Sequence, residues 1–272
     1  MIENIYHRAL DQHPEFADIP KEELLHVIRN GLHDIEKLET AAHPQHAKAA
    51  LTRDVAQNIA VLWDFSWPGV YDGQDRSDDR YTEFSRSRGM ERARLHHTAR
   101  IAKKIAELLS NKPQFNSPIG DIKANILKTK KMISQRGPKI IYNGTNPEND
   151  RVKNILHRDT IIIPQENVII DDKNIQNTND QIKTMILPEG LHQPGKEIGL
   201  ISHAPHLRRI ARVLNQSKNL PADMKVRLFP VATPQEGKEE YAAMEIMWLL
   251  YYAYLAKSAK LEAYPHIIHG EE

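Results

Sequence analysis

Apolar residues recur at helical spacing through the first part of the chain. Between residues 21 and 41 they stand three and four positions apart, with charged residues between them, which places them on one face of a helix. Pro20 suits the first turn of such a helix, because its missing amide hydrogen would have no partner there. We therefore expect residues 1–57 to form a helical N-terminal extension.

From residue 58 onward the pattern changes to short apolar runs that alternate with helical stretches. Turn residues bound the runs, which are rich in β-branched and aromatic residues, as is typical of strands. Five strands are predicted, at 58–65, 139–144, 167–171, 197–202 and 225–232. Helices are predicted at 90–109, 119–136, 148–157, 177–186, 206–216 and 238–261.

Strands that alternate with helices predict an α/β fold, because each crossover helix returns the chain to a parallel strand. We expect residues 58–272 to form one Rossmann-like domain. Its five-stranded, mainly parallel sheet would have strand order 3-2-1-4-5 and helices on both faces. Residues 66–89 are predicted to be a long polar loop, and loops of that length are usually functional.

Composition narrows the possible partners. The chain has 37 basic and 36 acidic residues, a net charge of +1, so no general electrostatic attraction for nucleic acid is expected. Cysteine is absent, which excludes disulfides and thiolate chemistry. The most apolar window, 246–256, is too short to span a bilayer, and the N-terminus does not resemble a signal peptide. We expect a cytoplasmic protein.

Common nucleotide and hydrolase motifs are missing. No GxGxxG follows the first strand and no GxxxxGK[ST] occurs anywhere, which argues against a standard dehydrogenase or P-loop ATPase. No GxSxG follows a strand either, which weakens the case for a serine hydrolase.

Ligands of open parallel sheets bind beyond the carboxyl ends of the strands, near the point where the strand order reverses. Every predicted strand up to the fourth ends in polar residues, so these ends form the expected site. The candidate residues there are Asp64, Ser66, Asn143, Gly144, Thr145, Ser202 and His203, and Asp171 and Asp172 follow the third strand.

The stretch "SHAPHLRR" leaves the fourth strand and begins a helix. Arg209 and its neighbours would lie near the positive end of the helix dipole, where a bound anion would offset their repulsion. The alternative, to which we give equal weight, is that these arginines form ion pairs with acids or extend over the edge of the sheet without binding an anion. His203 and His206 are either an acid/base pair or loop histidines. Their spacing alone is weak evidence for a metal, and we expect none.

Two helix starts carry further candidates. Glu148 is either a catalytic carboxylate or an acid in the first turn of its helix. Asn177 or Thr178 is expected to be the N-cap of the next helix, and either side chain could also face a ligand.

Five segments follow an order and spacing that is known from one protein family. They are "KIIYNG", the helix that Glu148 opens, "IIIPQENVIIDDKNIQNTNDQ", "EIGLISHAPHLRRIARVL" and "VRLFPVATP". Over roughly residues 58 to 258 the chain resembles the YdcF-like domain, which the SanA and ElyC envelope proteins of bacteria share. It would be a divergent member, with Asn-Gly-Thr in place of the usual Ser-Gly-Gly.

The resemblance implies a Rossmann-like domain of a bacterial protein that gathers these residues at one crevice. It also implies S-adenosylmethionine as a candidate ligand. Our leading hypothesis is a protein that binds an anionic small molecule or nucleotide-type ligand, with Arg209 holding the anion and with His206 and Glu148 as acid and base. The alternatives are a non-catalytic interaction protein that uses residues 1–57 and 66–89, and a metal-assisted phosphate-ester hydrolase that uses Asp64, Asp171 and Asp172.

Overall fold

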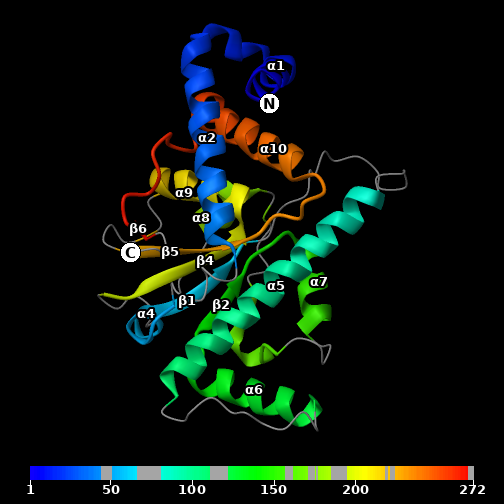
Figure 1. Cartoon of the computed structure of the whole chain (residues 1–272), viewed down its shortest axis with the longest axis vertical. Helices are drawn as coiled ribbons and strands as arrows, with labels where there is room; N and C mark the ends of the chain where they lie inside the picture. Colours follow the sequence, from blue (N-terminus) through cyan, green and yellow to red (C-terminus); the bar gives the residue numbers. More distant parts are fainter. Residues whose placement is uncertain are drawn as a thin grey trace.

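A parallel β-sheet forms the centre of the computed structural model (Figure 1). The structure describes residues 1–43, 51–65, 81–110, 122–156, 162–170, 175, 177–184, 195–217, 220 and 224–268. Ser66, Asp171 and Asp172 lie outside these residues.

The strands follow the order β3-β2-β1-β4-β5-β6, and all of the described pairs are parallel. The α/β class and the order 3-2-1-4-5 are thereby confirmed. The strands are β1 (Ile59–Asp64), β2 (Lys139–Tyr142), β3 (Val168–Ile170), β4 (Glu197–His203), β5 (Lys225–Val231) and β6 (Ile267–Ile268).

Two predictions about the elements are wrong. A sixth strand, β6, pairs with β5; it has only two residues, which is too short for a periodic pattern. Residues 81–89 are helical rather than part of a loop, because α5 runs over Tyr81–Leu109. The polar composition of this first part hid the helix.

Successive side chains of each strand point to opposite faces of the sheet, so each face packs against its own layer of helices. Val61 and Trp63 of β1 face one core, while Leu62 faces another. Figure 1 shows α5, α6 and α7 on one side of the sheet and α8, α9 and α10 on the other. The helices are α5, α6 (Ile122–Arg136), α7 (Asn146–Leu156), α8 (Thr178–Thr184), α9 (Ala204–Gln216) and α10 (Lys238–Leu250), which a π-helical turn (Tyr251–Leu255) extends.

The N-terminal helices cover α9 and α10. Ile28 of α2 packs in one apolar cluster with Ile246 of α10, and Leu38 reaches the main core. Gly31 lies so close to α9 that an added Cβ would be 3.0 Å from the Arg208 guanidinium. The elements of this region are α1 (Ile2–Gln12), the 3-10 turn Pro14–Asp18, α2 (Lys21–Ala41) and α4 (Arg53–Asn58); a second 3-10 turn, Gln165–Asn167, precedes β3.

Among the described residues, no helix combines the length and apolar character needed to cross a membrane.

Candidate functional site

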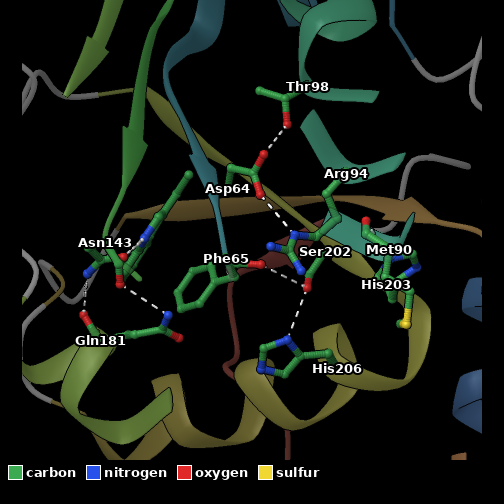
Figure 2. Close-up of polar contacts among 11 residues, drawn as sticks. Asp64, Phe65, Met90, Arg94, Thr98, Asn143, Gln181, Ser202, His203 and His206 are labelled. Carbon is green, nitrogen blue, oxygen red and sulfur yellow. Dashed lines mark hydrogen bonds and ion pairs between the residues drawn. The ribbon is translucent and has the colours of Figure 1, made fainter. Parts of the chain in front are cut away.

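The strand order reverses at β1 and β4, and buried polar side chains meet at the carboxyl ends of these strands (Figure 2). Asp64 and Ser202 are both fully buried there. They lie between α5 on one face of the sheet and α9 on the other.

Asp64 is held from α5. One of its carboxylate oxygens lies 3.2 Å from Nε of Arg94, and the other accepts a 2.7 Å hydrogen bond from the Thr98 hydroxyl. Arg94 is itself only 1% exposed, so both charges are buried together. Figure 2 shows Thr98 and Arg94 on either side of the carboxylate. Asp64 was predicted from its place at the strand end, whereas both of its partners were missed.

Asn143 joins β1, β2 and α8. Its side-chain oxygen accepts a 2.8 Å hydrogen bond from the Trp63 indole, and its amide nitrogen donates to the carbonyl of Gln181 at 2.9 Å. Gln181 donates back to the carbonyl of Asn143 at 3.1 Å. This reciprocal pair, visible in Figure 2, fixes α8 against the end of β2.

Gly144, Thr145 and Glu148 form the start of α7. One Glu148 oxygen accepts hydrogen bonds from the Thr145 amide at 2.8 Å and from the Thr145 hydroxyl at 2.9 Å. An acid at the third helical position that binds back to the N-cap amide is half of a capping box. The Gly144 amide donates to the Asn149 side chain at 2.9 Å. Of the two roles that the sequence allowed for Glu148, these contacts correspond to the acid in the first turn of its helix.

Asn177 is the N-cap of α8, as predicted. Its side-chain oxygen accepts a 3.0 Å hydrogen bond from the Asp180 amide, the bond that defines this type of cap. Thr178, the first helical residue, is fully buried and points instead toward His206 of α9.

Four side chains form a chain of hydrogen bonds across the site. Thr178 Oγ1 accepts from Arg209 Nη1 at 3.0 Å and lies 3.1 Å from His206 Nε2. On the other side of the ring, His206 Nδ1 lies 3.1 Å from Ser202 Oγ, which donates to the carbonyl of Phe65 at 3.3 Å. Figure 2 shows the part from His206 through Ser202 to Phe65.

Ser202 and burial together fix the protonation of His206. Ser202 gives its one proton to the carbonyl of Phe65 and therefore accepts from Nδ1. Burial lowers the pKa of His206 well below the usual range, and the charges of Arg209 and Arg94 add to this effect, so the ring is neutral. Its one proton is consequently on Nδ1, and Nε2 accepts from the Thr178 hydroxyl, whose oxygen also accepts from Arg209.

His203 lies between two backbone carbonyls. Its Nδ1 is 3.2 Å from the oxygen of Ala232, and its Nε2 is 3.2 Å from the oxygen of Met90. Burial and the charge of Arg94 nevertheless lower its pKa to about 4. The ring is therefore neutral near pH 7, where it donates to one carbonyl at a time and ties β4 to α5 or to the end of β5.

Arg209 is fully engaged in an ion pair. Its Nε and Nη2 lie 2.5 Å and 3.2 Å from the two oxygens of Glu245 in α10, which is 1% exposed. The Tyr252 ring stacks 5.4 Å from the guanidinium. Burial disfavours the charged form, but Glu245 outweighs it and raises the pKa of Arg209. An ion pair with an acid was one of the two arrangements expected for Arg209 from the sequence; the other was an anion site.

The neighbouring arginines of α9 face α2. Asp34 lies 2.6 Å from Arg212 Nη2 and 3.5 Å from Arg208 Nε. Arg208 is 4% exposed, and burial together with the charge of Arg212 lowers its pKa to about 9. The acid from the N-terminal extension thus offsets the positive charge at the start of α9.

The site therefore gathers Asp64, Asn143, Thr178, Ser202, His203, His206 and Arg209 at one edge of the sheet, while Asn177 and Glu148 serve helix starts. Sequence reasoning missed Arg94, Thr98, Gln181 and Glu245. The sequence does contain a signal for Glu245. This acid stands alone among apolar residues, directly before the apolar window 246–256, which indicates a buried carboxylate in need of a partner. Within the described ranges, no three His, Asp or Glu side chains gather in a way that could hold a metal ion.

Comparison with known proteins gives no match to a family model, to a curated protein or to a solved structure. The likeness to the YdcF-like domain rests on the motifs alone.

Removing either partner of the Arg209–Glu245 pair should destabilise the fold. We expect Arg209→Ala to lower the free energy of unfolding by about 3–5 kcal/mol, because Glu245 would remain buried and charged without its partner. The double variant Arg209→Met/Glu245→Leu should recover most of that loss, since it removes both charges. Urea unfolding measures both values; a double variant as unstable as Arg209→Ala would contradict the ion-pair explanation.

Stability should fall as the pH drops below the usual histidine pKa. The pKa of folded His203 is about 4, whereas that of an unfolded histidine is about 6.5. Above pH 6.5 the ring is neutral in both states; below it the unfolded chain binds the proton first. Each such histidine lowers the free energy of unfolding by about 1.4 kcal/mol per pH unit between these values.

Urea unfolding between pH 7.5 and 4.5 tests this for His203. His203→Gln should have a shallower loss of stability with falling pH than the wild type. His96→Gln, a substitution at an exposed position of α5, is the matched control. An unchanged slope for His203→Gln would show that His203 does not have a lowered pKa.

Proposed function

We propose that this chain is a divergent YdcF-like protein that binds an anionic small molecule or nucleotide-type ligand at the carboxyl ends of its strands. S-adenosylmethionine is the first candidate, and no reaction is assigned. The observation that carries the proposal is the concentration of buried polar side chains where the strand order reverses.

Core packing alone gives no reason for this concentration. Burying a polar group without a partner costs roughly 1–3 kcal/mol, and buried ion pairs are often no more stabilising than apolar residues of similar size. The bodies of the same strands are apolar: Val61, Leu62 and Trp63 precede Asp64, and Leu200 and Ile201 precede Ser202. Sequences depart from local rules mostly at functional sites, and the departure here lies where ligands of such sheets bind.

The contacts change the roles proposed for individual residues. We propose Asp64 and Arg94 as the charged pair that orients the ligand, because Asp64 ends β1 at the point where the strand order reverses. The positive charge of Arg94 extends to both His203 and His206. His206 becomes a positioning residue in this proposal, since its two ring nitrogens connect Thr178 of α8 to Ser202 of β4.

The N-terminal helices are less suited to the alternative of an interaction protein. Ile28 and Leu38 use the apolar face of α2 for packing within the chain, so this face is not exposed for a partner. The hydrolase alternative depends on Asp171 and Asp172, outside the described residues.

A thermal-shift screen tests the proposed site. S-adenosylmethionine, ATP and sugar phosphates are added to the wild type, and a ligand at about 100 times its dissociation constant should stabilise it by about 2.7 kcal/mol. The double variant Asp64→Asn/Arg94→Gln keeps polar groups of similar shape without the charges. It should fold and lose the shift.

The matched control is Glu197→Gln/Arg227→Gln. This second buried pair, with 2.7 Å between Oε2 and Nε, lies at the amino ends of β4 and β5, so its loss should leave the ligand shift intact. The proposal fails if no ligand of the screen stabilises the wild type, or if the Asp64/Arg94 variant shifts as the wild type does.

A further inference from the structure

A hollow lies away from the strand ends just described, beside the edge strand β3. It has a volume of about 430 Å³ and lies between α6, the end of α7 and the 3-10 turn before β3. A smaller hollow of about 280 Å³ shares Leu156 and Gln165 with it and continues along β3 to Ile170. The two hollows together form one groove. Ligand pockets are commonly 300–1,000 Å³, so the groove has room for a small organic molecule.

The floor of the groove is apolar. Val168 and Ile170 of β3 face it together with Leu156 of α7. Both β3 residues are only half-buried, unlike the fully buried Leu62 and Leu200 at the centre of the sheet. A ligand with an apolar body would remove this surface from water.

The rim of the groove is basic. Lys130 and Lys131 of α6 line the larger hollow, and Lys153 of α7 lines the smaller one. Over its 15 residues α6 has five basic side chains and no acidic one, in a chain whose net charge is only +1. In the part of the chain that the structure describes, no acid lies within ion-pair distance of Lys130 or Lys131.

Glu166 adds one acidic group to the lining, and its surroundings favour its charged form. Its pKa is lowered by hydrogen bonds from its own backbone and from Ser134, and by the charges of Lys139 and Lys130. Lys139 also donates a 2.8 Å hydrogen bond to the Glu166 carbonyl. With Lys130, Lys131 and Lys139 near this one carboxylate, positive charge predominates around the larger hollow.

We propose that this groove binds a small molecule that joins an apolar body to a phosphate group. The body would lie on Leu156, Val168 and Ile170, and the phosphate would lie between Lys130 and Lys131, since lysine ammonium groups bind phosphate as point charges. This site is separate from the Asp64–Arg94 site and does not depend on the proposed function.

Calorimetry with 1-naphthyl phosphate tests the proposal, with inorganic phosphate and 1-naphthol as probes for the head and the body alone. The wild type should bind 1-naphthyl phosphate at least about tenfold more tightly than either part, which corresponds to about 1.4 kcal/mol. Lys130→Gln/Lys131→Gln should lose this advantage while binding 1-naphthol as the wild type does.

Two further variants identify the groove. Lys123→Gln/Lys128→Gln removes the same charge from exposed positions of the same helix and should bind as the wild type does. Gln165→Trp places a large ring at an exposed position shared by both hollows and should block both 1-naphthyl phosphate and 1-naphthol.

Several results would overturn the proposal. They are a wild type that does not bind 1-naphthyl phosphate, equal losses in the Lys130/Lys131 and Lys123/Lys128 variants, and undiminished binding by Gln165→Trp. Asp64→Asn/Arg94→Gln should bind the probe normally; if it does not, the probe occupies the strand-end site instead.

Discussion

The chain of hydrogen bonds that begins at the Glu245–Arg209 ion pair holds together the carboxyl end of the sheet. It runs from α10 to α9, crosses to α8 at Thr178, returns through His206 and ends on the backbone of Phe65 just after β1. Every hydroxyl proton and ring nitrogen in it has one assigned role. Removing any member leaves a buried polar group without a partner, which costs more than an ordinary hydrogen bond contributes. The arrangement therefore fixes how α8, α9, α10, β4 and the end of β1 meet.

Charge is balanced locally at this end of the molecule. Asp64 pairs with Arg94, Glu245 with Arg209, and Asp34 of the N-terminal extension with Arg212. Burial keeps the His203 and His206 rings neutral by lowering the pKa of each, and the charges of nearby arginines add to this effect. The N-terminal helices complete this end of the molecule instead of lying apart from it, since Asp34 comes from α2.

Much of the fold could be predicted from local patterns in the sequence. The alternation of apolar runs and helical periods predicted five strands and their order, and the N-cap at Asn177 followed from residue type. The partners of the site residues were out of reach, since Asp64 and Arg94, or Arg209 and Glu245, are 30 and 36 positions apart and meet only through tertiary packing. The groove beside β3 was missed for the same reason: its lysines and apolar floor come from three elements, which tertiary packing brings together.

The protonation of His206 is the most direct test of this account, because it follows from the hydrogen bond that Ser202 donates to Phe65 and from the burial of the ring. Nitrogen-15 NMR of the histidine rings at pH 6 distinguishes the two neutral tautomers from each other and from the cation. The account predicts a neutral His206 ring with its proton on Nδ1. A proton on Nε2, or a doubly protonated ring, would contradict it.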